Sequence, residues 1–198
     1  MSTVFLVRHA RHSIVDQVLV GRMADVALSD EGRREAADLA AGFRGRPIAV
    51  VQSSPSQRAR ETAAPIAAAL GTDVEVVPAL DEIDFGRWTG SCFEALAPDP
   101  RWQAWNAARG SARPPGGESM TQAQARVVGH IERLGQPPGA AQAILVSHCD
   151  VIRAALLHVL GRPLDDWSTI EVAPASVSTI EIGDGAARVT AINERRPS

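Results

Sequence analysis

The stretch Thr3-Val-Phe-Leu-Val-Arg-His-Ala10 places an arginine and a histidine directly after a short apolar run. An apolar run of this length is typical of a buried strand, which we expect at Thr3 to Val7. Two later runs end in the same way: residues 48–52 lead into QSSPSQR (52–58), and residues 143–146 lead into VSHCD (146–150). In an open α/β sheet, ligands bind beyond the carboxyl ends of the strands. We therefore expect the three polar clusters to meet at one edge of a sheet.

Helical patterns separate these strands. Ser29, followed by two acidic residues, is typical of a helix start, and apolar residues then recur at helical spacing up to Phe43. Ser53-Ser54-Pro55 predicts a second helix, with Pro55 in its first turn, that ends at Gly71. Further elements are predicted by the same signals: strand 74–77, a helix near 100–108, helix 118–134, helix 150–160, and a hairpin of strands 177–182 and 187–192. The alternation predicts a three-layer α/β/α sandwich with a mostly parallel sheet.

Length and composition limit the number of domains, the partners and the cellular location that we expect. The 198 residues, 45% hydrophobic, suit a single domain over 1–198, with a lid-like insertion at about 88–117. A net charge of −3 without any basic run gives no support to nucleic-acid binding. Cys92 and Cys149 have no metal-binding spacing, and we expect both to be free thiols. No signal peptide or membrane span is recognised, so we expect a cytoplasmic protein that binds no membrane.

The predicted edge would gather two imidazoles and two guanidinium groups, from Arg8, His9, Arg58 and His148. Two arginines aimed at one point suit a phosphoryl group, and an imidazole there can attack phosphorus as a nucleophile. Such a site needs no metal, because the arginines neutralise the charge on the phosphoryl oxygens. A carboxylic acid must still protonate the departing oxygen. Asp81, Glu82 and Asp84 are all candidates, and their spacing does not choose among them.

Four blocks of the chain resemble the histidine phosphatase superfamily, branch 1, also called the phosphoglycerate-mutase-like family. They are LVRHA (6–10), SSPSQRARETA (53–63), LDEIDFGRWTG (80–90) and VSHCDVIRAAL (146–156), and the segments 21–32 and 115–119 resemble the family as well. The resemblance implies a mixed, mostly parallel sheet. It also implies that His9 is the phosphorylated nucleophile, that Arg8, Arg58 and His148 hold the phosphoryl group, and that Glu82 is the proton donor.

The chain also departs from the family pattern. Ala10 and Cys149 replace glycines that usually follow the two histidines, and Val15 stands where asparagine is common. Arg11 and His12 replace an acidic residue and a Ser or Thr, which hints at an anionic leaving group. We expect substrate contacts from Arg11, His12, Arg22 and Ser119.

The sequence favours a phosphomonoesterase that acts on a small-molecule phosphate without a metal or cofactor. Three alternatives stay open: a phosphoglycerate-type mutase, a catalytically silent binding module on the same fold, and a metal-dependent hydrolase built on His9, His12 and His148. A homodimer is compatible with the sequence. The leaving group is not identified, and sugar phosphates, nucleotide-derived phosphates and a cobalamin-precursor phosphate are candidates.

Overall fold

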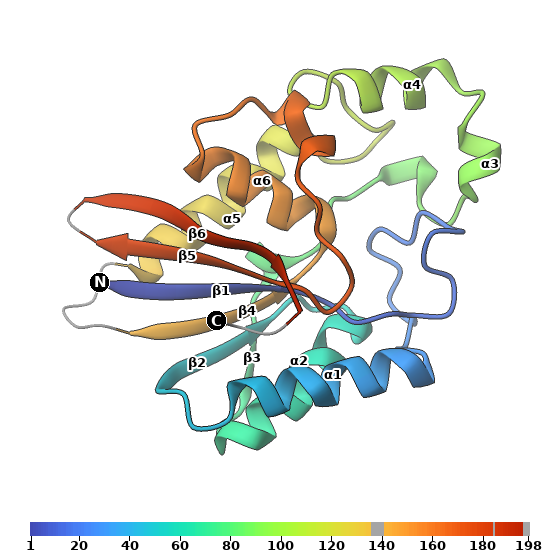
Figure 1. The fold of residues 1–198 in the computed structure, drawn as a ribbon. Helices are drawn as coiled ribbons and strands as arrows, with labels where there is room; N and C mark the ends of the chain where they lie inside the picture. Colours follow the sequence, from blue (N-terminus) through green and yellow to red (C-terminus); the bar gives the residue numbers. More distant parts are fainter. Residues whose placement is uncertain (136–140, 184, 196–198) are drawn as a thin grey trace.

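A computed structural model describes residues 1–135, 141–183 and 185–195. Its centre is a sheet of strands in the order β3-β2-β4-β1-β5-β6 (Figure 1). The strands are β1 (Ser2–Arg8), β2 (Ile48–Ser53), β3 (Val74–Val76), β4 (Gln142–Ser147), β5 (Val177–Gly183) and β6 (Ala186–Glu194). The first four pair in parallel, whereas β5 pairs antiparallel with both β1 and β6. The predicted mixed, mostly parallel sheet is confirmed.

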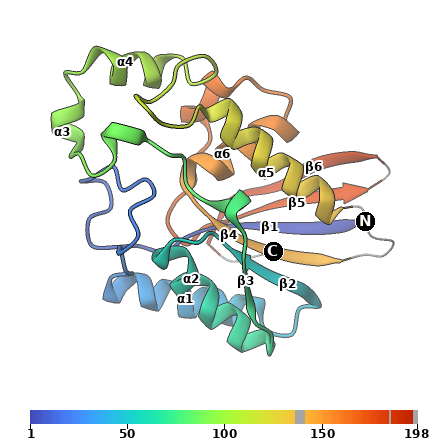
Figure 2. The same cartoon turned by 180° about the vertical axis from the view of Figure 1, so that it is seen from behind.

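Helices cover both faces of this sheet, as Figures 1 and 2 show from opposite sides. On one face lie α1 (Asp30–Phe43) and α2 (Gln57–Leu70), and on the other lie α5 (Met120–Leu134) and α6 (Cys149–Val159). Side chains of β1 alternate between the two cores: Val4 and Leu6 pack with α5 and α6, whereas Phe5 and Val7 pack with α1 and α2. The central strands are therefore buried on both faces, which explains their continuous apolar runs.

The register of the central strands sets the site. β4 lies between β1 and β2, with Arg8 opposite Ser147 and Ser53 opposite Val146. The carboxyl ends of all three strands thus reach the same edge, and the chain turns there into loops or helices. This arrangement brings together the three polar clusters that the sequence places after these strands.

One predicted boundary is wrong. The helix expected to open at Ser53-Ser54-Pro55 begins instead at Gln57, after the N-cap residue Ser56. Pro55 is therefore outside the first turn. The turn before the helix is held by the Ser54 hydroxyl, which accepts from the Ser56 backbone N–H and donates to Asp81 Oδ1.

Residues 88–117 contain two short helices, α3 (Phe93–Leu96) and α4 (Pro100–Ala107), which lie beyond the sheet edge (Figure 1). Trp105 of α4 is fully buried, and Trp88 meets Trp102 edge to face at 5.3 Å between ring centroids. The segment is thus packed around its own tryptophans. That it acts as a lid stays a prediction.

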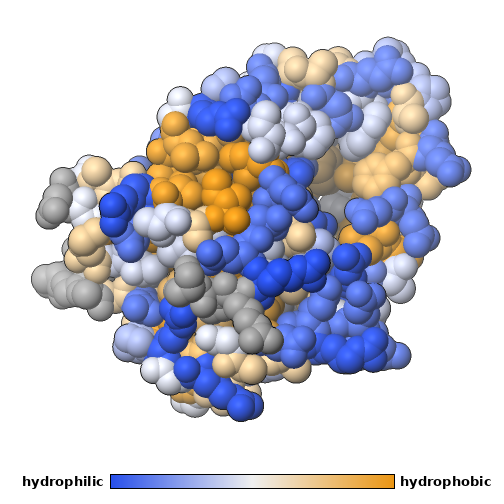
Figure 3. Space-filling model, in the orientation of Figure 1, coloured by the Kyte–Doolittle hydropathy of each residue, from blue (hydrophilic) through white to orange (hydrophobic). Residues whose placement is uncertain are grey.

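The surface is mainly polar, with apolar side chains gathered over α6 on the face seen in Figure 3. Within the described residues, no helix combines the length and apolar character needed to cross a bilayer.

Candidate active site

His9 lies at the point where β1 ends, and its imidazole is oriented by the backbone. Its Nδ1 is 2.9 Å from the Ala10 carbonyl oxygen, which can only accept a hydrogen bond. Nδ1 therefore carries the proton, and Nε2 keeps its lone pair. Burial, together with the charges of Arg58 and Arg8, lowers the pKa of His9 well below its usual value. The imidazole is thus neutral, with an unprotonated nitrogen available for attack.

Arg58, in the first turn of α2, connects the imidazoles of His9 and His148. Its Nε lies 3.4 Å from His9 Nε2, and one Nη lies 3.1 Å from His148 Nδ1. The same Nη donates to the Gly21 carbonyl at 2.7 Å, which fixes the guanidinium in the pocket. Arg58 is only 1% exposed, yet its other Nη has no hydrogen-bond partner among the described residues. A buried, unpaired guanidinium N–H is a ready anion contact.

Arg8 supplies a second such group. One Nη donates to the Val172 carbonyl at 2.7 Å, whereas its buried Nε has no partner in the part of the chain that the structure describes. The first turn of α2 adds helix N–H groups nearby. Arg8 and Arg58 therefore present unused donors around His9 Nε2, where an oxyanion would sit.

His148 is fully buried and is held from two sides. Its Nδ1 accepts from Arg58, so Nε2 carries the proton and donates to Ser54 Oγ at 2.8 Å. The Ser54 hydroxyl in turn donates to Asp81 Oδ1 at 3.1 Å. Burial, and then the charge of Arg58, lowers the pKa of His148 well below its usual value. The ring centroids of His9 and His148 are 5.2 Å apart.

Glu82 is the acid that faces the pocket. One carboxyl oxygen accepts from the Ile83 N–H at 2.9 Å, and the other lies 3.8 Å from His148 Nδ1. Burial, and then the charge of Asp150, raises the pKa of Glu82 to about 7. The other two candidates have structural contacts instead: Asp81 accepts from Ser54, and Asp84 accepts from the Gly86 N–H at 2.8 Å.

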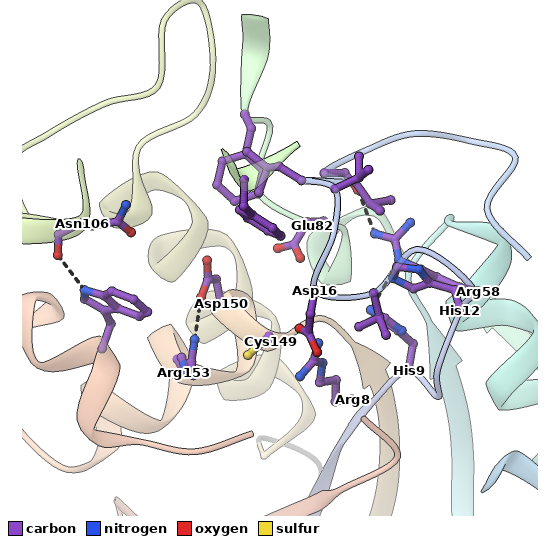
Figure 4. A pocket seen from close by; sticks show the side chains of 18 of the residues that line it. Arg8, His9, His12, Asp16, Arg58, Glu82, Asn106, Cys149, Asp150 and Arg153 are labelled. Atoms are coloured by element: carbon purple, nitrogen blue, oxygen red, sulfur yellow. Dashed lines mark hydrogen bonds and ion pairs between the residues drawn. The ribbon is translucent and has the colours of Figure 1, made fainter. Parts of the chain in front are cut away.

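Arg8, His9, Arg58 and Glu82 line a cavity of about 320 Å³ at the carboxyl edge of the sheet, whereas His148 is not part of its lining. Figure 4 shows His9, Arg58 and Arg8 at one side of the cavity, Glu82 above, and Asp150 with Arg153 toward the other side. His9 is 4% exposed but lines this cavity, so a small molecule can reach it. The arrangement can bind a phosphoryl group, attack it and protonate its leaving group.

Comparison with known proteins agrees with this geometry. The sequence profile of the histidine phosphatase superfamily (branch 1) matches residues 4–195. The chain belongs to this superfamily. The bifunctional protein Rv2228c of Mycobacterium tuberculosis is 34% identical over 193 residues, which are 96% of this chain and 53% of that protein. The chain thus spans about half the length of the curated relatives that it matches first.

The names of two other similar proteins describe different activities. A probable phosphoglycerate mutase GpmB of Yersinia pestis is 29% identical over 184 residues, covering 91% of this chain and 85% of the relative. The solved structure of the mycobacterial glucosyl-3-phosphoglycerate phosphatase Rv2419c superposes with a TM-score of 0.86 at 27% identity, covering 98% of this chain and 99% of that one. The phosphoglycerate-mutase-like fold is confirmed.

The expected substrate contacts separate into two groups. His12 lines the cavity, its pKa lowered to about 4 by burial and then by Arg58 and Arg8. The other three lie outside the lining: Arg11 is bound to Glu35, Arg22 pairs with Glu118 at 2.9 Å, and Ser119 caps α5.

The part of the cavity that lies away from His9 was not predicted from the sequence. Its lining there includes Asp150, Arg109, Arg153, Trp167 and Trp102. Asp150 stands two residues after His148 at the start of α6, so its position was a usable signal. Arg109 and Trp167 belong to no motif, and only the fold brings them to the site.

Cys149 is a packing residue with an unreactive thiol. Its Sγ lies 3.5 Å from the Val172 carbonyl oxygen, and burial raises its pKa to about 11. Cys92 is also a free thiol and is exposed.

Proposed function

We propose that this chain is a phosphomonoesterase that hydrolyses a small-molecule phosphate through a phosphohistidine on Nε2 of His9. One observation carries the proposal: Nδ1 of His9 is committed to the Ala10 carbonyl, so Nε2 is unprotonated and accepts from Arg58 Nε, beside buried guanidinium N–H groups that have no partner among the described residues. A fixed nucleophile and unused anion donors at one point favour phosphoryl transfer over a structural role.

In the first step, Nε2 of His9 attacks phosphorus while the bond to the leaving oxygen breaks. Arg8 and Arg58 neutralise the phosphoryl oxygens, and protonated Glu82 gives its proton to the leaving oxygen. The product alcohol departs, and the phosphoryl group stays on His9.

In the second step, ionised Glu82 takes a proton from a water molecule, and the resulting nucleophile attacks the phosphohistidine. The N–P bond breaks, inorganic phosphate forms, and Glu82 is again protonated. His148 is neutral because its Nδ1 accepts from Arg58, and its Nε2 donates to Ser54, which keeps Nδ1 directed toward Arg58 and Glu82. Each step is assigned to side chains alone, so the proposal requires no metal.

A generic aryl phosphate tests this proposal. We expect the wild type to release phosphate from 4-nitrophenyl phosphate with and without EDTA, and His9→Ala to lose the activity by roughly 10³-fold or more. His158→Ala is the matched control, since His158 is exposed on α6 outside the cavity. A His9→Ala enzyme with full activity contradicts the proposal. Loss of activity in EDTA supports the metal-dependent alternative instead.

We propose further that the protein acts in the cytoplasm and binds neither nucleic acid nor membrane. The net charge of −3 and the two free thiols support this. A homodimer stays compatible with the chain, and sedimentation at several concentrations measures its assembly state.

A further inference from the structure

The cavity extends away from His9 to a second group of charged side chains, Asp150, Arg109 and Arg153. Figure 4 shows Asp150 and Arg153 at the end opposite His9, with Glu82 between the two ends. In an in-line displacement, the leaving oxygen departs on the side opposite the nucleophile. Because Glu82 must also reach that oxygen, the leaving group of a bound substrate occupies this end, which we call the leaving-group half.

Two arginines meet a single carboxylate in the leaving-group half. Asp150 accepts from Arg109 at 2.7 Å and from Arg153 at 3.1 Å. The other aspartate of the lining, Asp16, lies beside Arg8 at the phosphoryl end in Figure 4. One of the two arginines neutralises Asp150, so the second leaves one positive charge in this half of the cavity.

Both arginines also keep N–H groups that the protein does not use. Arg109 donates to Asp150 and Asn106 through its two Nη atoms, but its buried Nε has no partner among the described residues. Arg153 donates through Nε to the Ile170 carbonyl and through one Nη to Asp150, and no hydrogen bond of its other Nη is seen in the described part of the chain. A buried donor without an acceptor is costly unless a ligand supplies one.

A purely structural role accounts for only part of this cluster. Arg109 comes from the insertion and Asp150 from α6, and the Arg109 guanidinium lies 3.9 Å from the centroid of the Trp167 ring, so the contact holds the insertion against the body of the protein. Such a contact needs only one arginine on Asp150. It explains neither the second positive charge nor the position of both arginines in the lining of the cavity.

We infer that Arg109 and Arg153 form a subsite for a carboxylate on the leaving group of the phosphomonoester. The inference rests on the proposed phosphatase function. One positive charge matches one carboxylate, and the unused N–H groups match its oxygens. Aromatic side chains of the lining, from Phe85, Phe93 and Trp102, supply contact for the body of the leaving group.

This subsite replaces the one that the sequence hinted at. An anionic leaving group was expected from Arg11 and His12. Arg11 is instead paired with Glu35 and Glu31 and lies outside the lining, and His12 is neutral because burial lowers its pKa to about 4. The positive charge for such a leaving group comes from the insertion and α6.

Two substrates of equal size test the inference. We compare kcat/KM for 4-carboxyphenyl phosphate and 4-carbamoylphenyl phosphate at a pH just below the pKa of Glu82, where the carboxylate of the substrate is ionised. The wild type should prefer the carboxylate compound by roughly tenfold, the effect of one charged hydrogen-bonded contact. Arg153→Gln should bring this ratio close to one, whereas Arg153→Lys, which keeps the charge, should retain part of the preference. The ratio cancels any effect on Glu82 that both substrates share.

Asp150→Asn should change the ratio in the opposite direction. Without the Asp150 carboxylate, Arg109 and Arg153 present two positive charges, so the preference for the carboxylate compound should rise by roughly threefold or more. Arg162→Gln is the matched control, since Arg162 pairs with Asp166 in an exposed contact outside the cavity, and it should leave the ratio unchanged.

The outcomes separate the inference from the proposed function. A wild type without preference for the carboxylate compound, or a preference that persists in folded Arg153→Gln, overturns the inference alone. Hydrolysis of 4-nitrophenyl phosphate without hydrolysis of the carboxylate compound does the same. If Arg153→Gln does not fold, a ratio that stays unchanged in Asp150→Asn overturns it. If the wild type hydrolyses none of the three esters, the proposed function fails and the inference falls with it.

Discussion

At the scale of a single residue, the proposed mechanism requires two protonation states of Glu82. In this mechanism, its carboxyl group must be protonated when the leaving oxygen departs and ionised when water attacks. Burial and Asp150 raise its pKa to about 7, which places both forms within reach near neutrality. Arg22 and Arg126 donate to its backbone carbonyl at 2.7 Å and 3.2 Å, and these hydrogen bonds hold the backbone of Glu82 in place.

We predict that phosphate transfer to His9 slows as the pH rises through about 7, because Glu82 then loses the proton that it must donate. The pKa of His9 lies well below its usual value, so the nucleophile stays neutral on the acidic side of this limit. Measured kcat against pH for a phosphate ester with a poor leaving group checks the prediction. A rate that stays flat into strongly alkaline solution contradicts the assigned role.

Glu82→Gln should lower the activity of the protein but raise the stability of its fold at pH 8. We expect kcat to fall by roughly 10²–10⁴-fold, since the amide cannot act as the acid or the base. A carboxyl group whose folded pKa is raised costs stability above its unfolded pKa, and the cost grows until the pH passes the folded value of about 7. The variant should therefore be more stable than the wild type at pH 8, by about 1–3 kcal/mol. Denaturant unfolding measures this difference, and equal stability at pH 8 contradicts it.

At the scale of elements, a turn at Gly86 packs the segment that follows Glu82 against the loop that precedes α5. Gly86 has φ 54°, and a Cβ built there would lie 2.3 Å from the Pro115 carbonyl oxygen. Glu118 donates its N–H to the Asp84 carbonyl at 2.7 Å in the same contact. Close approach of two backbones, together with a left-handed conformation, explains why glycine stands at this position.

Gly86→Ala should therefore destabilise the fold by about 2–4 kcal/mol and lower kcat, because the turn must open next to Glu82. Gly45→Ala is the matched control: Gly45 has φ 74°, but nothing lies within 4 Å of its built Cβ. It should cost only about 1 kcal/mol and leave kcat unchanged. Thermal and denaturant unfolding compare the two, and equal losses contradict the steric argument.

The elements themselves were largely predictable. Continuous apolar runs predicted β1, β2 and β4, and the spacing from Ala36 to Phe43 predicted the buried face of α1. The start of α2 was not, because Ser54 uses its hydroxyl for His148 and Asp81 rather than for a helix cap. These contacts join residues that are distant in sequence, so local helix propensity could not predict them.

At the scale of the whole molecule, the phosphate half of the site follows from topology. Once the strands are parallel, Arg8, His9, Arg58 and His148 must meet at the carboxyl edge. Three acidic residues lie in the segment of Glu82, so the proton donor could be chosen among them only from the resemblance to the superfamily or from the structure. The leaving-group half was not predictable, since Arg109 comes from the insertion and Trp167 from the short turn Leu164–Thr169. Only packing joins them to Asp150.

Anion binding should stabilise the entire domain. Arg8 and Arg58 have unpartnered buried N–H groups among the described residues, and a phosphate-like oxyanion would satisfy them. Vanadate or phosphate at 100 times its Kd should raise stability by about 2.7 kcal/mol and raise the Tm. The shift should disappear in Arg8→Ala and persist in Arg162→Ala, an exposed position outside the cavity. A shift of equal size in both variants contradicts the proposed anion site.

The most direct test is to trap the intermediate and locate its phosphoryl group. Rapid acid-free quenching during turnover of an aryl phosphate, followed by peptide mass spectrometry and phosphorus NMR, identifies both the residue and the nitrogen atom. The structure predicts one phosphoryl group on His9, bonded to Nε2, because Nδ1 is held by the Ala10 carbonyl. Phosphate found on His148, on His12 or on Nδ1 of His9, or turnover without any phosphorylated histidine, would contradict the account.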